Sequence, residues 1–569
     1  MEKIWRIKPA ISEDFQTKFP EVNPVVLQLL FNRGLTDQEK IDEFQNPDYG
    51  QDIHDPFLFR DMDKAVNRIM QAIKQKEKIV VHGDYDADGV TSSVLLVETL
   101  TKLGAKQSDL YIYIPHRNTE GYGLNKETVK NLIDSRAQLI ITVDCGISNK
   151  EEVEMAQQAG IDVIINDHHH VPEVLPPAYA IINPQVKDDN YPFAQLAGVG
   201  VAFKLAQALL KKNKVNGGFA KWLLDLVAIG SVADSVPLLG ENRTLVRYGL
   251  VVLNKTRRAG LRALIEKSGG RFGELNSRSI GFQIAPRLNA AGRIGHANTA
   301  YQLLISRQEQ SCLDLAEQLN KTNWERQQIT ERLTKEALAQ VGEIKDKYLL
   351  FIEGQGEDWQ PGIVGLIAGK IADKFFRPTF VISQSQGEYV GSGRSIDQLD
   401  IMEVLEKSRK HLHKFGGHPQ ACGFTLKGKD NLQDFKKEAA DFVQNKLAGL
   451  DLRPQIEVDV KIELKEINWD LVEQLGQFNP FGEANPKPHF LAEELLIERI
   501  ERVGLDKSHL KLLVSQGEEK KKIIAFGFGK LAERVKEGDK LKAILEIDTA
   551  EWNGTKEIQL KAIDLKKYG

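Results

Sequence analysis

The sequence predicts an α/β protein of several domains: a parallel-sheet domain, a long connecting helix, a second α/β domain and an all-β barrel. Three observations support this fold class. The chain of 569 residues is too long for one hydrophobic core. Short β-branched runs alternate with helix-like segments between Lys78 and Asp234, which indicates a parallel sheet covered by helices. Residues 450–569 alternate apolar and polar positions between turns, as small barrels do.

Five parts are expected along the chain. Apolar positions between Asn23 and Pro47 predict two short amphipathic helices. From residue 298 to 347 glycine and proline are scarce and apolar side chains recur every three or four positions, which predicts one long helix. The predicted parts are residues 1–75 (N-terminal helical segment), 76–297 (parallel-sheet domain), 298–347 (connecting helix), 348–449 (second α/β domain) and 450–569 (barrel).

The composition excludes several classes of protein. Hydrophobic residues make up 41% and charged residues 27% of the chain, as in globular proteins. With 76 basic and 80 acidic residues the net charge is -4, so any site for a polyanion must be a local patch. Cys145, Cys312 and Cys422 form no CxxC pair, which argues against disulfides and a thiolate zinc site. Without a signal sequence or a long apolar stretch, we expect a cytoplasmic protein with no membrane segment.

Acidic residues and histidines recur at the ends of the predicted parallel strands. In HGDYDADG they are spaced by two, so in extended backbone they share one face. The carboxyl ends of strands in an open parallel sheet line the ligand crevice, so these side chains should meet there. The positions concerned are His82, Asp84, Asp86, Asp88, Asp144, Asp167, His168, His169 and Asp234.

This set of residue types predicts a metal centre. Carboxylates gathered at one edge repel each other unless cations neutralise them, and oxygen with imidazole ligands suits Mn²⁺ or Mg²⁺. Two such cations can activate a water and clamp a phosphodiester, which predicts a metal-dependent phosphodiesterase. A single aspartate such as Asp88 is more often a turn former or helix cap, whereas five at strand ends favour a metal site. For His170 we expect a structural or solvent-facing role.

The motifs resemble those of a known superfamily. HGDYDADG, VDCG, NDHH and VAD, in this order, resemble the four motifs of the DHH phosphoesterases. GFQIAPRLNAAGRIGH, GSGRS and FGGHPQACGF resemble segments of the RecJ family of bacterial exonucleases, and the likeness runs over essentially the whole chain. It implies a DHH domain, a connecting helix, a DHH-associated domain and an OB-fold. It also implies a single-stranded-DNA-specific 5′ to 3′ exonuclease that releases 5′ mononucleotides in DNA repair and recombination, with a helicase and a single-strand-binding protein as partners.

The resemblance also implies roles for individual residues. By motif matching, the metal ligands would be Asp86, Asp88, Asp144, His168 and Asp234. His169 joins them as a catalytic residue that could equally contact the scissile phosphate. His82 and Asp84 lie near the site, and direct ligation by them is left open.

Ten further positions are predicted to contact nucleic-acid phosphates. Arginine forks grip phosphate oxygens, and glycines let backbone amides approach them. Interdomain salt bridges are the alternative for the arginines, and ordinary tight turns for the glycines. Phe526, Phe528 and Trp552 are weaker candidates to stack on bases, because strand aromatics more often belong to a core. The ten positions are Arg287, Asn289, Arg293, Ser392, Gly393, Arg394, Ser395, Gly416, Gly417 and His418.

Two other functions fit part of the pattern. A DHH enzyme for short oligoribonucleotides or cyclic dinucleotides would share the metal motifs and the GGH loop, but would not need residues 1–75 or 450–569. A non-catalytic DNA-binding scaffold descended from such a nuclease would typically have lost ligand acids. All of them are present here.

Overall fold

A computed structural model describes residues 2–117, 119–345, 347–385, 388–428, 430–552 and 554–568. The chain forms two compact units. Among the described residues, no helix has the length and apolar character needed to cross a membrane. Unit 1 comprises Met1–Ile53, Pro237–Arg247 and Pro454–Gly569, and unit 2 comprises His54–Val236 and Tyr248–Arg453.

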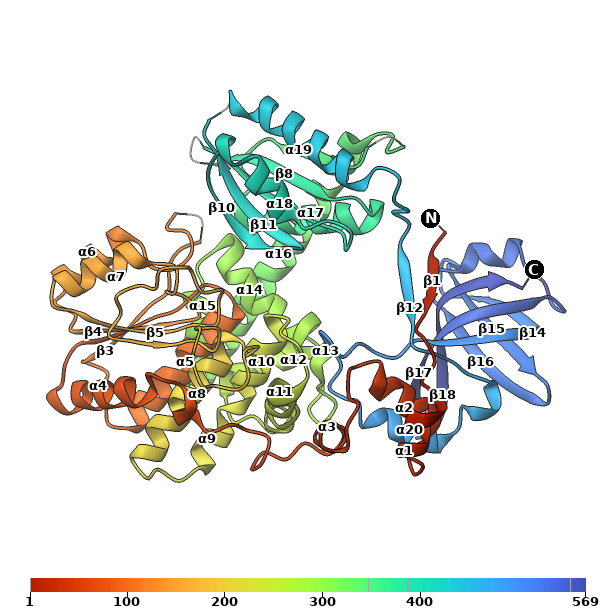
Figure 1. Cartoon of the computed structure of the whole chain (residues 1–569), viewed down its shortest axis with the longest axis horizontal. Helices are drawn as coiled ribbons and strands as arrows, with labels where there is room; N and C mark the ends of the chain where they lie inside the picture. The colour runs from red at the N-terminus through yellow and green to blue at the C-terminus, as the bar shows by residue number, and fades with distance from the viewer. Residues whose placement is uncertain are drawn as a thin grey trace. The chain divides into compact units, whose positions relative to one another are not determined.

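Unit 2 contains a five-stranded, all-parallel sheet in the order β3-β2-β4-β5-β6. Strands β2 and β4 are buried along their whole length, as their apolar runs predict for a sheet covered on both faces. Helices α6 (Lys126–Asp134) and α7 (Lys150–Gln158) cover one face, and α5 (Ala87–Lys102) and α8 (Gly198–Lys212) cover the other (Figure 1). The strands are β2 (Ile79–His82), β3 (Leu110–Tyr113), β4 (Leu139–Val143), β5 (Asp162–Asn166) and β6 (Ala180–Ile182).

Helices dominate the rest of this part of the chain. They include a short π-helix, η2 (Ile280–Ile284), between α13 and α14. The others are η1 (Pro56–Leu58), α4 (Met62–Gln75), α5 (Ala87–Lys102), α6 (Lys126–Asp134), α7 (Lys150–Gln158), α8 (Gly198–Lys212), α9 (Gly218–Trp222), α10 (Leu224–Ala233), α11 (Gly240–Leu253), α12 (Ala259–Lys267), α13 (Ser277–Ser279), α14 (Ala285–Ile294) and α15 (Asn298–Ile305). The residues of α11 up to Arg247 are assigned to unit 1.

A long helix follows, as predicted, but it begins later. Helix α16 runs over Glu309–Val341, and its buried side chains, among them Leu319, Leu333 and Ala337, form one stripe. Residues 298–305 form the separate helix α15, which ends where Ser306 turns extended with ψ 143°. No glycine or proline marks this break, so no stop signal is visible in the sequence.

The second α/β part of unit 2 is a five-stranded sheet in the order β10-β11-β9-β8-β7. Only β7 and β8 pair in parallel. Phe380, Phe424 and Phe435 pack together in its core. The elements are β7 (Leu350–Gly354), α17 (Pro361–Phe375), β8 (Thr379–Ser385), β9 (Glu388–Arg394), α18 (Ile401–Lys407), η3 (Arg409–His411), β10 (Leu412–His418), β11 (Ala421–Leu426) and α19 (Asn431–Leu447).

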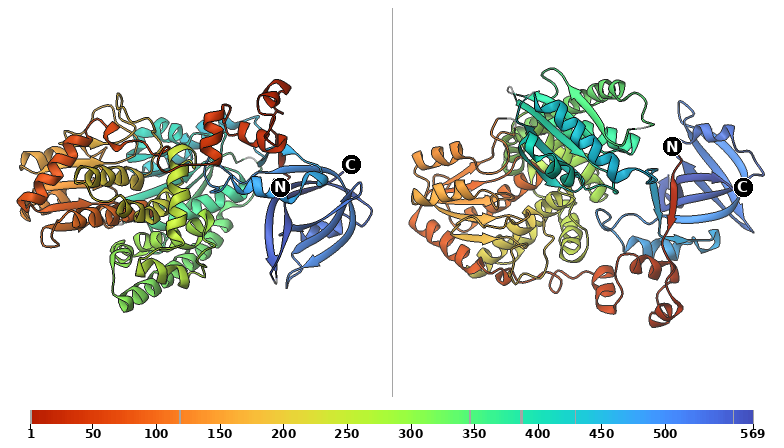
Figure 2. Two further views of the ribbon diagram at one scale, coloured as in Figure 1. Left: turned by 90° about the horizontal axis from the view of Figure 1, so that it is seen from below. Right: turned by 45° about the horizontal axis from the view of Figure 1, so that its top comes forward.

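Unit 1 is built on a closed barrel, which the left view of Figure 2 shows in blue. Pairing of β14 with β17 closes the sheet β14-β15-β16-β18-β17. An additional strand near the N-terminus, β1, pairs in parallel with β12, and a run of four residues was too short to predict it. The strands are β1 (Ile4–Ile7), β12 (Gln455–Val458), β13 (Val460–Lys461), β14 (Phe490–Val503), β15 (His509–Gln516), β16 (Glu519–Ala525), β17 (Lys540–Trp552) and β18 (Thr555–Lys567).

The N-terminal helices of unit 1 pack into the core of the barrel. Leu29, Leu30 and Phe44 join the cluster of buried barrel side chains. The N-terminal residues up to Ile53 therefore belong with the barrel, whereas α4 belongs to unit 2. The five-part division remains a prediction. The helices are α1 (Glu13–Lys18), α2 (Pro24–Phe31), α3 (Gln38–Gln45), η4 (Leu464–Glu466), α20 (Trp469–Gly476) and η5 (Gly529–Glu533).

Candidate metal centre

The loop between β2 and α5 brings three aspartates to the carboxyl edge of the parallel sheet. Asp86 caps α5: its Oδ1 accepts hydrogen bonds from the backbone N–H groups of Asp88 (2.9 Å) and Gly89 (3.1 Å). Position 89 requires glycine because a Cβ there would lie 2.7 Å from the backbone of Asp84. Asp84 is 3% exposed, and its Oδ1 has no hydrogen-bond partner among the described residues. A buried carboxylate oxygen in this state needs a proton or a cation.

Helix α8 approaches the same edge through its N-terminus. The Asp88 carboxylate accepts hydrogen bonds from the backbone N–H groups of Gly198 (2.7 Å) and Val199 (2.9 Å), which belong to the first turn and lack helical partners. Asp144 follows β4 with a φ of 62°, which costs free energy for a residue other than glycine. A Cβ on Gly198 would lie 2.5 Å from Asp144 Oδ1. Glycine at 198 therefore lets α8 pack directly against both carboxylates.

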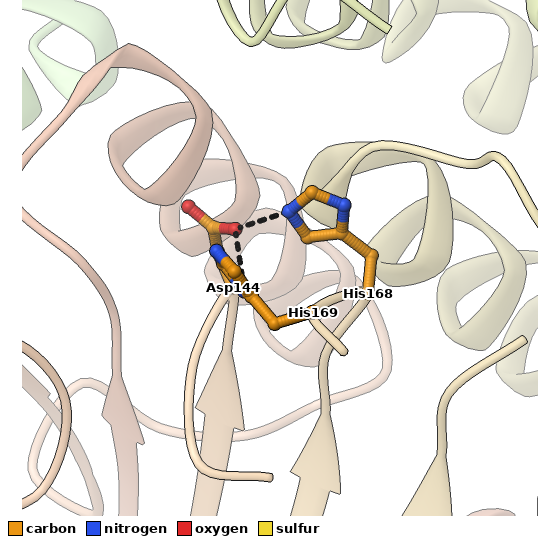
Figure 3. Close-up of side chains that lie close together, drawn as sticks. All are labelled: Asp144, His168 and His169. Carbon is orange, nitrogen blue, oxygen red and sulfur yellow. Dashed lines mark ion pairs between the residues drawn. The ribbon is translucent and has the colours of Figure 1, made fainter. Parts of the chain in front are cut away.

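The histidines after β5 converge on Asp144, as Figure 3 shows. His168 Nε2 lies 3.2 Å from Asp144 Oδ1 and 3.7 Å from Oδ2 of Asp234, the C-cap residue of α10. His169 Nδ1 lies 4.0 Å from Asp144 Oδ1 and 2.7 Å from Asp167 Oδ1. Asp167 is fully buried and also accepts a hydrogen bond from the backbone N–H of His168 (2.7 Å). Through these hydrogen bonds Asp167 fixes the orientation of the two histidines. His170, in contrast, is exposed.

The carboxylates of this cluster resist ionisation together. Burial and then the charge of Asp86 raise the pKa of Asp88 to about 7. Burial, followed by neighbouring carboxylates, also raises the pKa values of Asp84, Asp144 and Asp234 well above their usual range. Cations placed among these groups would remove the repulsion and favour the ionised carboxylates.

The two histidines have opposite protonation states. Burial, and then the charge of His169, lower the pKa of His168 to about 4. The imidazole of His168 is therefore neutral and has a lone pair with which it can bind a metal ion. Burial alone would lower the pKa of His169, but the hydrogen bond with Asp167 outweighs it and raises that pKa to about 9. A neutral imidazole that can bind a metal ion, His168, thus lies beside a cationic imidazole that can donate hydrogen bonds, His169.

Three overlapping groups of described residues could hold a metal ion, each with ligand atoms within 4.8 Å of one another. Asp144 belongs to two of the groups and His168 to two, so the groups fit adjacent cations. Carboxylate oxygens with imidazole are the donors that Mn²⁺ and Mg²⁺ accept. The groups are Asp144–His168–His169, Asp88–His168–Asp234 and Asp84–Asp86–Asp144.

His82, also predicted near the site, belongs to none of these groups. It is fully buried, its ring stacks on Tyr113 with centroids 5.4 Å apart, and its Nδ1 lies 3.6 Å from Cys145 Sγ. Burial lowers the pKa of His82 to about 4, so it is neutral.

The loop after β3 supplies two residues that sequence reasoning missed. The Tyr122 hydroxyl donates a hydrogen bond to the backbone carbonyl of Asp144 (2.9 Å) and lies 3.0 Å from His169 Nδ1. The Arg117 guanidinium lies 4.8 Å above the ring of Tyr85. The sequence could have indicated both residues, because the loop follows a predicted parallel strand and therefore starts at the same edge of the sheet.

Three arginines gather beside the carboxylates. Burial, and then the charges of Arg117 and Arg326, lower the pKa of Arg293 to about 9. Burial also lowers the pKa of Arg394, and Arg117 adds to this effect. Among the described residues, none of Arg117, Arg293 and Arg394 forms an ion pair with a carboxylate. They make a cationic group that suits a phosphate.

Two residues of APRLNAAGR support the structure around the centre. The Asn289 Oδ1 accepts a hydrogen bond from the backbone N–H of Ala87 (2.7 Å) and so secures the first turn of α5. Arg287 donates to the Gln283 carbonyl oxygen (2.7 Å) and to Asn320 Oδ1 (3.0 Å). Because these partners are neutral, the alternative of interdomain salt bridges does not hold for Arg287.

In the GSGRS segment the backbone amides are not free as expected, while phosphate binding by Ser392, Gly393, Arg394 and Ser395 stays a prediction. The residues from Gly391 to Arg394 lie in β9, which pairs with β8 on one side and β11 on the other, so their backbone amides do not point freely at a phosphate. The glycines make room for rings instead: a Cβ on Gly391 would lie 2.2 Å from the Phe424 ring, and one on Gly393 2.5 Å from the Phe380 ring. The Ser395 hydroxyl donates to the Leu399 carbonyl.

The side chains of Ser392 and Arg394 instead face α17. The Ser392 hydroxyl donates to the Cys422 carbonyl and lies 3.3 Å from Arg394 Nη1. In the GGH segment, Gly416, Gly417 and His418 are exposed at the end of β10. Although the side chain of His418 is accessible to solvent, nearby protein atoms partly desolvate it and lower its pKa, and the charges of His169 and His170 lower that pKa further.

The barrel aromatics have mixed positions. Phe526 is exposed, whereas Phe528 packs against the core of unit 1. The side chain of Trp552 lies outside the described residues.

For the phosphodiester hydrolysis that the sequence predicts, replacing Gly198 with alanine is expected to lower kcat, measured with added Mn²⁺, about a hundredfold. The added methyl group displaces the Asp144 carboxylate, and errors of about 1 Å near the reacting groups have effects of this size. Gly200→Ala on the same helix is the matched control, because a Cβ there meets only the Leu196 side chain, at 3.3 Å. Equal single-turnover rates for the two variants would contradict this account of the site.

Three family models match the chain. The DHH family, N-terminal domain, matches residues 78–231, the DHHA1 domain matches residues 345–445 and the RecJ OB domain matches residues 458–564. The first two fall in unit 2 and the third in unit 1.

Similar proteins cover nearly the whole chain. The single-stranded-DNA-specific exonuclease RecJ of Bacillus subtilis (strain 168) is 40% identical over 546 residues, which are 95% of this chain and 68% of that protein. The RecJ of Dickeya dadantii (strain 3937) is 34% identical over 567 residues, 96% of each chain. The crystal structure of RecJ in complex with Mn²⁺ from Thermus thermophilus has a TM-score of 0.84 and 27% identity, over 100% of this chain and 80% of that chain. The same Thermus protein has also been solved with Mg²⁺.

Proposed function

Because the chain belongs to the RecJ family of single-stranded-DNA-specific exonucleases, we propose that it hydrolyses the phosphodiester bonds of single-stranded DNA from the 5′ end and releases 5′ mononucleotides. The observation that carries the proposal is the pair of ligands, Asp144 and His168, that the overlapping groups at the sheet edge share. Shared ligands support two adjacent divalent cations, Mn²⁺ or Mg²⁺.

We assign the metal ligands by these groups. Asp84, Asp86 and Asp144 would hold one cation, and Asp88, His168 and Asp234 the other. When bound, such cations supply a water of lowered pKa and neutralise charge on the reacting phosphate. Asp167 keeps His169 protonated below a pKa of about 9, so His169 can donate a hydrogen bond to a phosphate oxygen. Tyr122 holds the backbone of Asp144 in its strained conformation.

The arginines support the polarity of the reaction. Arg117, Arg293 and Arg394 have no carboxylate partner among the described residues, so their charge is available to the terminal phosphate of the strand. A terminal phosphate bound there would place the adjacent phosphodiester at the cations. From the resemblance to the family we further propose a role in DNA repair and recombination in the cytoplasm, with delivery of the strand by a helicase or a single-strand-binding protein.

The alternatives explain less of the molecule. An enzyme for cyclic dinucleotides or short oligoribonucleotides has no use for the barrel of unit 1, which matches the RecJ OB domain. A scaffold without activity has no use for buried carboxylates whose repulsion only cations relieve.

The substrate is tested with end-labelled oligonucleotides and Mn²⁺. We expect single-stranded DNA labelled at its 5′ end to release labelled mononucleotide as the first product, while duplex DNA and cyclic dinucleotides react slowly. Arg394→Gln should raise KM for 5′-phosphorylated strands about tenfold and affect 5′-hydroxyl strands less, since charge-assisted hydrogen bonds are lost. Arg332→Gln, which removes an exposed arginine paired with Asp358, is the control. Cyclic dinucleotides as the preferred substrate would contradict the proposal.

A further inference from the structure

The last turn of helix α14 packs directly on the loop that carries the first metal ligands. Tyr85 separates the proposed ligands Asp84 and Asp86 in this loop. A Cβ on Gly292 would lie 2.4 Å from the carbonyl oxygen of Tyr85. Asn289, three residues earlier and therefore on the same face of α14, accepts a hydrogen bond from the first turn of α5 (2.7 Å). Because protein interiors are close-packed, a side chain at position 292 would displace the loop.

The same turn of α14 also packs on the start of helix α17. A Cβ on Gly362, the second residue of α17, would lie 2.4 Å from the carbonyl oxygen of Arg293 and 3.0 Å from its Cα. The Arg293 side chain returns to this contact, because its Nη1 donates a hydrogen bond to the Gly362 carbonyl oxygen (2.9 Å). Glycine at position 362 therefore lets the backbones of the two helices meet directly.

Helix α17 extends this packing to β9. Gly362, Gly365 and Gly369 recur at spacings of three and four, so they share one face of α17. A Cβ on Gly365 would lie 3.1 Å from Ser392 Oγ and 3.2 Å from Arg394 Nη2. One on Gly369 would lie 4.0 Å from Arg394 Cγ, which is ordinary van der Waals contact. The packing against this face is therefore tightest at position 362 and loosest at position 369.

These contacts form a continuous path from the metal ligands to Arg394. The loop of Tyr85 packs against α14, α14 against α17, and α17 against β9 and its Arg394 side chain. At Gly292 and Gly362 the nearest neighbour is a backbone carbonyl, which cannot swing away as the end of a long side chain can. Neither Arg394 nor Arg293 pairs with a carboxylate among the described residues, so both charges are available to a phosphate.

We propose that Gly292 and Gly362 are positioning residues, which fix the distance between the bound cations and the arginines that hold the terminal phosphate. A terminal phosphate at Arg394 places the adjacent phosphodiester at the cations only if this distance is correct. A methyl group at position 362 would need about 1 Å of movement to reach ordinary contact, and a misplacement of this size slows a reaction about a hundredfold. The inference rests on the proposed function, because it concerns two sites on the same strand.

Gly362→Ala tests the spacing. This variant should lower kcat for 5′-phosphorylated single-stranded DNA about a hundredfold and leave KM nearly unchanged, because the terminal phosphate still binds but the bond is misplaced. Strands with a 5′-hydroxyl, which no terminal phosphate positions, should lose much less, so the ratio of the two rates falls. The Kd of Mn²⁺, measured by calorimetry, should stay nearly unchanged because the metal ligands are not displaced. A purely structural role would lower both rates equally.

The other two glycines of α17 provide a graded comparison. Gly365→Ala meets the movable ends of two side chains, so its effect on the ratio should be smaller than that of Gly362→Ala. Gly369→Ala is the matched control and should leave the ratio unchanged. All three variants exchange glycine for alanine in one helix, so the gain in helix propensity is similar. If Gly362→Ala does not fold, the comparison of Gly365→Ala with Gly369→Ala decides, and equal ratios for these two contradict the proposal.

Gly292→Ala should act on the cations instead. Because it displaces the loop of Asp84 and Asp86, it should weaken Mn²⁺ binding about tenfold, as changes behind metal ligands do, and slow both kinds of strand equally. An unchanged ratio of rates in Gly362→Ala, or unchanged Mn²⁺ binding in Gly292→Ala, would overturn the proposal. Absence of hydrolysis of single-stranded DNA by the unaltered chain with Mn²⁺ would instead count against the proposed function.

Discussion

Asp144→Ala is expected to lower kcat on single-stranded DNA at least about a thousandfold. Asp144 is a ligand of one assigned cation, and its Oδ1 lies 3.2 Å from Nε2 of His168, a ligand of the other, so its loss removes a ligand from one position and disturbs the second. Charge stabilisation by bound cations is worth several kcal/mol in the transition state, and about 4 kcal/mol corresponds to a thousandfold. The measurement is single-turnover release of a 5′ label with saturating Mn²⁺.

The control for Asp144→Ala is Asp188→Ala. Asp188 also has a positive φ, 64°, and lies in unit 2, but it is exposed. Both variants change an aspartate in the left-handed region, so a difference between them reflects ligation and not backbone strain. Asp144→Ala with activity within tenfold of the unaltered chain would falsify the assignment of the metal centre.

Removal of divalent cations is expected to abolish hydrolysis and to make the folded state less stable as pH rises from about 4 to about 7. The pKa of Asp88 is raised from 3.8 to about 7 in the folded chain, and those of Asp84, Asp144 and Asp234 are also raised. Between the unfolded and folded pKa values the folded state binds more protons, so its stability declines with increasing pH. Bound Mn²⁺ reverses this trend because it favours the ionised carboxylates.

Thermal unfolding at pH 5 and pH 8 measures this effect. In EDTA we expect the Tm of the transition that includes unit 2 to be lower at pH 8 by at least about 5 °C, since 1 kcal/mol corresponds to a few degrees for a unit of this size. Mn²⁺ should raise Tm more at pH 8 than at pH 5. Asp144→Ala removes one repelling carboxylate and should show a smaller pH dependence in EDTA. A Tm in EDTA that is the same at both pH values would contradict the electrostatic account.

The α/β class and the place of the acidic cluster could be predicted because both depend on local patterns. Buried strands such as β2 and β4 are continuous apolar runs, and a residue that directly follows a parallel strand must lie at the carboxyl edge of its sheet. The sequence alone could therefore predict that three aspartates lie close together: Asp84, Asp86 and Asp144. The break between α15 and α16 could not, because no residue with a strong conformational preference lies there.

The sequence by itself determined the fold class, the family resemblance and the chemistry of the cluster, because residue types and their spacing carry that information. Only the tertiary structure decided which polar groups are left without partners. Asn289 turned out to secure α5, and the glycines of GSGRS make room for Phe424 and Phe380, since packing between distant segments sets those contacts. In the described part of the chain, the same packing leaves Arg293 and Arg394 beside the carboxylates without an ion pair. A free charge depends on every neighbouring segment, so no local pattern can reveal it.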